Sequence, residues 1–186
     1  VELECDICKG KRFKDEITAI KYNGVSIDML LKMTVDDTIQ FFRKYNQSKI
    51  VSKLLPLQSV GLGYVSLGQS SNTLSGGEAQ RIKLASFIGK GDQIEKTFFI
   101  FDEPTTGLHF HDVRKLLNTF DKLIRMGHSI LVIEHNLDMI SCADHIIDLG
   151  PEGGDKGGEV VAEGSPEEII KNINSYTGQY LKSKII

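Results

Sequence analysis

Residues 74–81 read Leu-Ser-Gly-Gly-Glu-Ala-Gln-Arg, and this stretch contains the start of a helix. Ser75 stands three residues before Glu78, which is the spacing of a capping box, and the pattern predicts a helix that runs through Ile88. The helical spacing of its apolar residues predicts that Arg81 faces away from them. The first two helical positions are both glycine, and each glycine costs roughly 1 kcal/mol relative to alanine in a helix interior. A helix that needed only to begin would not place two glycines there.

The two glycines, Gly76 and Gly77, leave backbone N–H groups with no side chains over them. These groups lie beside the Ser75 hydroxyl and at the positive end of the helix dipole, a combination that favours an anion, and the natural anion is a phosphate. The alternative is an ordinary capped helix with incidental glycines. The residues that follow along the chain favour the phosphate site.

The length and composition bound the class of protein. The 186 residues are 40% hydrophobic and 25% charged, which fits one α/β domain with an added subdomain. No apolar run is long enough to span a membrane, and the first residues do not form a signal peptide, so we expect a cytoplasmic protein. The net charge of −3 argues against a protein that coats nucleic acid by bulk electrostatics. Because the chain opens on Val1 rather than methionine, we expect it to be a piece of a longer protein.

Two of the three cysteines, Cys5 and Cys8, form a C-x-x-C pair. Two thiolates at this spacing chelate zinc, but a structural zinc site needs four ligands, so the pair predicts half a site whose other cysteines lie upstream. A redox pair and a chance pair are the alternatives. The basic residues that follow either contact phosphates or form a solvated loop: Lys9, Lys11, Arg12 and Lys14.

The sequence patterns of residues 14–73 predict a small region that is mainly helical. Alternation over residues 17–22 and the turn signal Asn23-Gly24 predict a β-hairpin. Thr34 is placed to cap a helix. Residues 48–59 form an amphipathic pattern in which Pro56 predicts an interruption. We interpret this region as a helical subdomain that delivers the glycine-rich helix, and a plain helical packing layer is the alternative.

Residues 97–101 are nearly continuously apolar, which predicts a strand of a parallel sheet covered on both faces. The strand runs directly into Asp102 and Glu103, and charges at the carboxyl end of such a strand lie where open α/β sheets bind ligands. Adjacent strand residues point to opposite faces, so the two carboxylates are expected to do different work. One suits Mg²⁺, directly or through water, and the other suits orienting or deprotonating an attacking water. A merely structural turn is the alternative.

A second apolar strand is predicted at residues 129–133, after a long amphipathic helix that Gly127 ends. This strand also ends in polar residues, Glu134-His135-Asn136, and a histidine at that edge of the sheet suits contact with a terminal phosphate. The other four histidines lack this placement and are interpreted as structural. Further strands are predicted at residues 145–149 and 159–163, with helices after Ser165 and over residues 176–182.

Together these residues resemble an ABC-type ATPase domain in its C-terminal half. Residues 74–81 are similar to the ABC signature and residues 98–103 to the Walker B strand, while His135 falls on the switch histidine. Residues 105–109 stand where the D-loop belongs. Within the family, Leu67-Gly68-Gln69, the turn that ends in His109, the segment 148–154 and the cysteine motif at residues 5–13 are most similar to a bacterial DNA-repair branch.

The resemblance implies an α/β fold with a mostly parallel sheet and flanking helices, plus a helical signature subdomain and a partial zinc knuckle. It divides the chain into the end of a zinc module (residues 1–13), the signature subdomain (14–96) and the Walker B half of the core (97–186). It also implies ATP, Mg²⁺ and Zn²⁺ as cofactors. The implied partners are damaged double-stranded DNA, a second subunit of the repair complex that is loaded onto the DNA, and a second copy of the same protein.

The resemblance also implies a role for each site residue. Asp102 would hold Mg²⁺ through water, Glu103 would polarise the attacking water, and His135 would contact the γ-phosphate. The signature residues would close over the γ-phosphate that the other ATPase domain holds: Ser75, Gly76, Gly77, Glu78 and Gln80.

One departure from the family is the phosphate loop. The motif G-x-x-x-x-G-K-[ST] is absent, because Gly10-Lys11 and Gly89-Lys90 lack the rest of the pattern. We therefore expect ATP hydrolysis in the full-length protein and weak or no ATP binding by this chain alone. The alternatives are another ABC ATPase, from a transporter or an SMC-like repair protein, and a non-catalytic interaction module.

Overall fold

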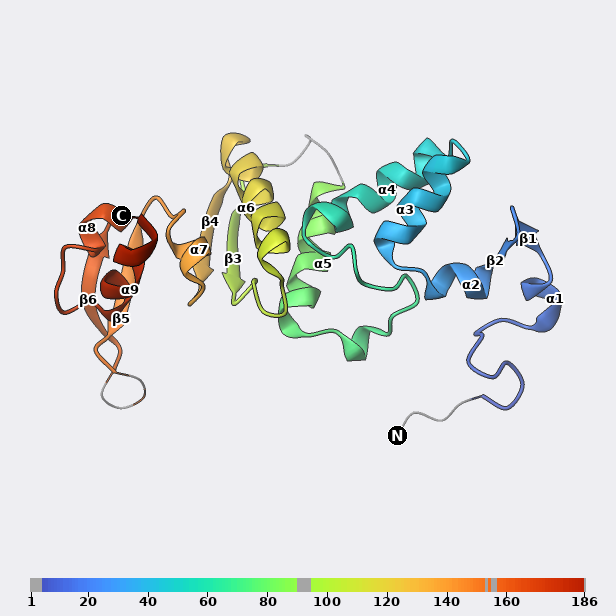
Figure 1. The fold of residues 1–186 in the computed structure, drawn as a ribbon, viewed down its shortest axis with the longest axis horizontal. Coiled ribbons are helices and arrows are strands. Elements are labelled where there is room, and N and C mark those ends of the chain that lie inside the picture. The colour runs from blue at the N-terminus through green and yellow to red at the C-terminus, as the bar shows by residue number, and fades with distance from the viewer. Residues whose placement is uncertain (1–4, 90–94, 153, 155–156, 186) are drawn as a thin grey trace. The chain divides into compact units, whose positions relative to one another are not determined.

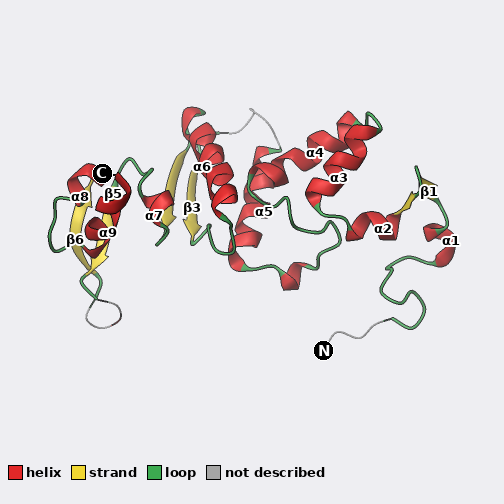
Figure 2. Ribbon diagram, viewed as in Figure 1, coloured by secondary structure: helices red, strands yellow, loops and turns green. Residues whose placement is uncertain are grey.

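The computed structural model describes residues 5–89, 95–152, 154 and 157–185. The chain divides into two compact units, Val1–Glu95 and Lys96–Ile186 (Figure 1). The described part of the first unit is helical apart from one short hairpin, whereas the second contains both longer strand pairs (Figure 2). Residues 1–4, which belong to the predicted zinc module, lie outside the described residues.

The first unit begins with two short helices that flank a hairpin: α1 (Asp15–Thr18), β1 (Lys21–Tyr22), β2 (Val25–Ser26) and α2 (Ile27–Lys32). At the turn, Asn23 and Gly24 have φ angles of 49° and 84°, the left-handed backbone that a two-residue hairpin turn requires. The predicted antiparallel hairpin is confirmed. It is shorter than expected because Ile17 belongs to α1 instead of extending the first strand.

The core of the first unit forms between α3 (Val35–Lys44) and α4 (Ser48–Ser59), beside α5 (Gly76–Ile88). Thr34 caps α3 as predicted, because its hydroxyl oxygen accepts from the backbone N–H of Asp37 at 3.1 Å. The predicted interruption at Pro56 is wrong. The proline lies in the last part of α4 and costs the helix one backbone hydrogen bond without ending it. The buried side chains of this core are Val35, Ile39, Phe42 and Val51.

The second unit contains the predicted βαβ arrangement of β3 (Phe98–Asp102), α6 (Phe110–Arg125) and β4 (Ser129–Ile133). The two strands pair in parallel, with Phe98 opposite Ser129 and Asp102 opposite Ile133. The helix α6 packs its apolar stripe against one face of the pair, where the Phe101 and Phe120 rings have centroids 4.9 Å apart. Gly127, with a φ of 89°, follows the end of the helix.

The other face of β3 and β4 differs from the prediction of a strand covered on both sides. Its side chains, Phe98, Ile100, Leu131 and Ile133, are between 43% and 62% exposed. These residues alternate with the buried face, as strand geometry requires, but no described element packs on them. The apolar run therefore marks a pair of strands with one covered and one open face.

The last part of the second unit consists of α7 (Leu137–Ile140), β5 (Ile146–Gly150), β6 (Glu159–Gly164), α8 (Pro166–Ile169) and α9 (Tyr176–Ile185). The strands β5 and β6 are antiparallel, so among the described residues only β3–β4 realises the predicted parallel pairing. Asp148 ties α9 to β5, because its carboxylate accepts from the hydroxyls of Ser175 at 2.6 Å and Thr177 at 2.7 Å. The α/β fold class is confirmed.

Candidate nucleotide-binding site

The start of α5 has the predicted capping box. The Ser75 hydroxyl oxygen accepts from the Glu78 backbone N–H at 3.2 Å, and the Ser75 backbone N–H donates to the Glu78 carboxylate at 2.8 Å. Gly76 is exposed, and a Cβ placed on it would meet no atom within 4 Å. Gly77 is buried, so the expectation of two open glycines holds for Gly76 alone. Gln80 is partly buried on the same helix.

Arg81 lies in the interior behind this helix start. Its side chain is fully buried, on the same face of α5 as Leu84 and Ala85. The expectation that Arg81 points away from the packed face is therefore wrong. Its charge faces Glu78 and the Tyr64 hydroxyl, and both contacts act on the pKa values of those groups. A buried arginine is retained when such groups compensate its charge.

Tyr64 is a residue of this site that the sequence patterns did not indicate. Its hydroxyl donates to the Glu78 carboxylate at 2.6 Å. This hydrogen bond is the largest cause that holds the pKa of Glu78 below its ordinary value of 4.5, and burial acts in the opposite direction. Burial, followed by the hydrogen bond to Glu78, raises the pKa of Tyr64. The capping carboxylate is thus held in its ionised form from a loop that precedes the helix.

Replacing Tyr64 with phenylalanine should raise the pKa of Glu78 toward 4.5, because the main group that favours the carboxylate is removed. A carboxyl group whose pKa is lower in the folded state than in the unfolded state stabilises the fold at pH values above its unfolded-state pKa. This stabilisation is lost as the pH falls through the folded-state pKa. The variant should therefore lose less stability than wild type on acidification below about pH 4.5. Carboxyl ¹³C NMR titration measures the shift. The matched control is the pKa of Glu167, which is lowered by hydrogen bonds from its own backbone and from Ser165 and should not change in the variant. An unchanged pKa of Glu78 would contradict the role assigned to Tyr64.

The second group of predicted residues lies at the carboxyl end of β3 and β4. Asp102 is the last residue of β3 and stands opposite Ile133, so Asp102 and His135 lie at the same end of the pair. Glu103 leaves the strand with a φ of 46°, a left-handed conformation rare for a side chain of this kind. Its backbone N–H still donates to the Ile133 carbonyl oxygen at 2.9 Å. Glu103 therefore lies just beyond the strand, where strand alternation no longer sets the direction of the side chain.

The Glu103 carboxylate has a neighbour on each oxygen. His135 Nδ1 lies 3.8 Å from one oxygen, close enough for an ion pair when the imidazole is protonated. The Thr106 hydroxyl donates to the other oxygen at 3.4 Å. Both Glu103 and His135 are exposed, with side chains 55% and 78% accessible. Exposed carboxylates at a strand end provide the hard oxygen donors that Mg²⁺ prefers, so the donor set fits this ion.

Glu134 is the second residue of this site that the sequence patterns did not indicate. Its carboxylate accepts from the backbone N–H groups of Thr105, His135 and Asn136 and from the Thr105 hydroxyl. Burial acts to raise the pKa of Glu134, but these hydrogen bonds outweigh burial and the pKa lies below its ordinary value. The sequence feature that could have indicated Glu134 is a carboxylate at the end of an apolar strand, directly before the candidate histidine.

The cysteine pair offers part of a metal site. The pKa of the Cys5 thiol is lowered, chiefly because the Cys8 backbone N–H donates to it, and a thiolate is the form that binds zinc. Within the described residues, no group of three or more histidine, cysteine or acidic side chains is placed to hold a metal. Two thiols fit half of a tetrahedral zinc site and no more.

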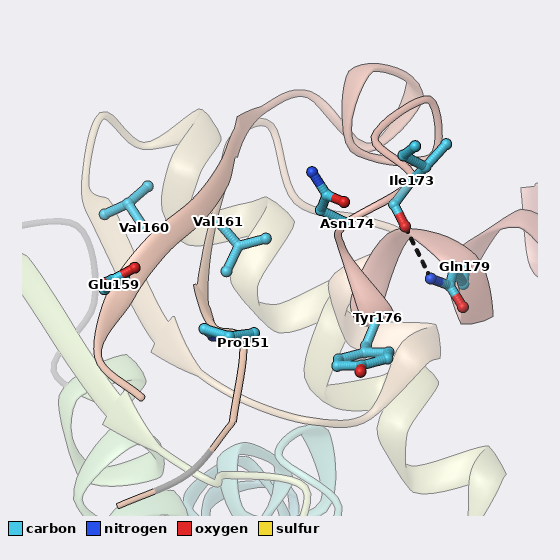
Figure 3. Close-up of a pocket in the computed structure, with 8 residues that line it drawn as sticks. All are labelled: Pro151, Glu159, Val160, Val161, Ile173, Asn174, Tyr176 and Gln179. Carbon is cyan, nitrogen blue, oxygen red and sulfur yellow. Dashed lines mark hydrogen bonds between the residues drawn. The ribbon is translucent and has the colours of Figure 1, made fainter. Parts of the chain in front are cut away.

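A hollow of the described structure lies elsewhere, beside β6 and α9. It has a volume of about 510 Å³, and Tyr176, Ile173 and Val160 are among its lining residues (Figure 3). None of the predicted site residues contributes to it. The candidate chemistry lies on exposed strand and helix ends instead, and we assign the site from these charged groups. None of the described helices has the length and apolar composition of a membrane span.

Comparison with known proteins reveals extensive similarity. No family model matches the chain. UvrABC system protein A of Clostridium acetobutylicum is 55% identical over 185 residues, which cover 100% of this chain and 19% of that protein. The same protein of Aquifex aeolicus is 54% identical over 182 residues, covering 98% of this chain and 19% of the relative.

Two solved structures resemble the fold. UvrA2 from Deinococcus radiodurans matches with a TM-score of 0.81 and 38% identity over 98% of this chain and 22% of its own. A bacterial Atm1-family ABC exporter with ATP bound matches with a TM-score of 0.50 and 18% identity over 88% of this chain and 31% of its own, which shows the fold alone. The chain spans about a fifth of the length of the curated relatives, and over that span it belongs to the UvrA family of ABC-type ATPases.

Proposed function

We propose that this chain is the C-terminal part of the second ATPase domain of a DNA-damage-recognition protein that acts in nucleotide excision repair. The observation that carries the proposal is the placement of Asp102, Glu103 and His135 at one end of a single parallel strand pair. The similarity to UvrABC system protein A supports it over the whole chain. In the full-length protein, ATP hydrolysis is coupled to DNA binding and to loading of the UvrB subunit.

The site residues divide into two groups with different tasks. Glu103 orients and polarises the attacking water, and His135 contacts the γ-phosphate from the neighbouring strand end. Asp102 would hold Mg²⁺ through water, and the ion would supply positive charge beside the phosphate oxygens. The residues at the start of α5 close over the γ-phosphate held by the other ATPase domain: Ser75, Gly76, Gly77, Glu78 and Gln80.

The partners that we propose follow from the same assignment. A protein that recognises many kinds of lesion reads the shape and deformability of double-stranded DNA rather than its base sequence. The protein acts as a dimer in the cytoplasm, and Cys5 and Cys8 supply two of the four ligands of its zinc. Because the chain contains no phosphate-loop motif, we expect it to bind ATP weakly by itself and to hydrolyse it only as part of the full-length protein.

Replacing Gly76 with alanine in the full-length protein tests the proposed contact of α5 with the phosphate. The new methyl group meets no atom within 4 Å, so the fold should tolerate it. It stands where a phosphate approaches the backbone N–H groups, and we expect ATP turnover to fall by about tenfold or more. Phosphate release measures the effect.

The matched control for this substitution is Ser86→Ala, at an exposed position on the same helix. It should change neither turnover nor thermal stability. If Gly76→Ala retains wild-type turnover while the protein stays folded, the helix start does not grip the phosphate. If wild-type full-length protein shows no ATP hydrolysis, the proposed function as a whole is wrong.

A further inference from the structure

The Glu134 carboxylate joins two segments that are far apart in the sequence. One oxygen accepts from the Thr105 backbone N–H at 2.9 Å and from the Thr105 hydroxyl at 2.5 Å. The other accepts from the backbone N–H groups of His135 at 2.9 Å and Asn136 at 3.1 Å. Hydrogen bonds to a charged acceptor are roughly twice as strong as neutral ones, so this carboxylate holds both segments firmly.

The two segments carry the groups that flank Glu103. Thr106, which follows Thr105, donates to one oxygen of the Glu103 carboxylate at 3.4 Å, and His135 Nδ1 lies 3.8 Å from the other oxygen. One backbone hydrogen bond, from Glu103 to the Ile133 carbonyl, connects the strands just before this point. After the strands end, the hydrogen bonds to Glu134 connect the loop that follows β3 with the turn that follows β4.

Glu134 itself is not suited to chemistry on a substrate. A carboxylate accepts at about four lone-pair sites, and the four donors occupy all of them. The side chain is also partly buried between the strand ends, whereas the Glu103 side chain is exposed. Glu134 therefore acts on neighbouring groups rather than on a nucleotide or a water.

We propose that Glu134 is a positioning residue for ATP hydrolysis, which fixes Thr105 and His135 so that Thr106 and His135 hold the Glu103 carboxylate in one orientation. This inference rests on the proposed function and adds to it the group that sets the geometry of the catalytic carboxylate. A small misplacement of a catalytic group reduces turnover strongly without removing the binding contacts. The role therefore predicts an effect on kcat that exceeds the effect on KM.

The test uses Glu134→Gln in the full-length protein, with kcat and KM for ATP measured separately. The glutamine side chain has the same shape, but its NH₂ group is a donor and faces two of the four donors that contact the carboxylate. At least two of the four hydrogen bonds are therefore lost. We expect kcat to fall by about tenfold to a hundredfold while KM changes by less than about threefold. Glu163→Gln, at an exposed position of β6, is the matched control and should leave both constants unchanged.

The Thr105 hydroxyl provides a graded test of the same connection. Thr105→Val removes one of the four hydrogen bonds and should lower kcat by less than Glu134→Gln does. Thr105→Ser keeps the hydroxyl, so the kcat of this variant should stay near the wild-type value. Equal loss in the valine and serine variants would show that the hydroxyl bond to Glu134 has no part in positioning, and would overturn the inference.

A measurement without nucleotide separates positioning from general stability. In nucleotide-free Glu134→Gln protein, amide hydrogen exchange should rise at residues 105–106 and 134–137 and stay unchanged in α3. Faster exchange throughout residues 96–186, or an increase in KM with unchanged kcat, would overturn the positioning role. If Glu103→Gln is inactive but Glu134→Gln keeps full kcat, the inference alone fails. If the wild-type full-length protein does not hydrolyse ATP, the proposed function fails instead.

Discussion

Glu103→Gln in the full-length protein should lower ATP turnover by about 10²–10⁴-fold, the contribution typical of a positioned general base. The carboxylate is exposed at the carboxyl end of β3 and lies between His135 and Thr106. A glutamine amide has the same shape but does not polarise or deprotonate water. ATP binding should persist, because Asp102 and His135 remain in place. Phosphate release and isothermal titration with Mg-ATP measure the two effects.

The matched control for Glu103→Gln is Asp121→Asn, which changes another exposed carboxylate of the second unit. Asp121 pairs with Arg125 on the surface of α6, and such exposed pairs contribute little to stability. Turnover should be unchanged in this variant. Wild-type turnover in Glu103→Gln would remove the role assigned to the residue, and loss of ATP binding would assign Glu103 to nucleotide binding instead.

Arg81→Ala should destabilise the first unit by about 3 kcal/mol, the scale of removing a large buried side chain together with its charge contacts. Arg81 is fully buried, and its charge compensates that of the Glu78 carboxylate. Its loss leaves a cavity under the start of α5. Urea unfolding of the chain, followed by circular dichroism at the helix band, measures the change.

Two further variants show what Arg81 contributes. Lys83→Ala, at an exposed position of the same helix, should change stability by less than about 0.5 kcal/mol. Arg81→Met keeps much of the volume without the charge and should recover part of the loss. If Arg81→Ala unfolds at the same urea concentration as Lys83→Ala, the buried arginine does not support the helix start.

The start of α5 illustrates what local sequence predicts and what it does not. The capping box depends on the three-residue spacing of Ser75 and Glu78, and the structure contains both of its hydrogen bonds. Arg81 is buried beside Glu78 and Tyr64, and Tyr64 comes from a loop 14 positions before Glu78, to which its hydroxyl donates. Helical spacing alone assigns a charged side chain to solvent, so the prediction for Arg81 was wrong.

The ends of β3 and β4 also combine features that the sequence patterns predicted with features that they did not. The two apolar runs predicted a parallel pair, and parallel pairing brings Asp102 and His135 to one end of the sheet. The left-handed backbone of Glu103 and the four hydrogen bonds on Glu134 come from the turns that follow the strands. Turn geometry of this kind depends on contacts between two loops, and strand periodicity carries no information about them.

The open faces of the two strand pairs have a consequence for handling the chain. Phe98, Ile100, Leu131 and Ile133 on one pair, and Ile147, Leu149 and Val160 on the other, meet water directly. Transfer of such side chains out of water is favourable at about 25 cal/mol per Å². In any preparation where nothing else shields them, copies of the chain gain free energy by stacking these faces. The purified polypeptide should then form concentration-dependent oligomers and precipitate first at high protein and high salt.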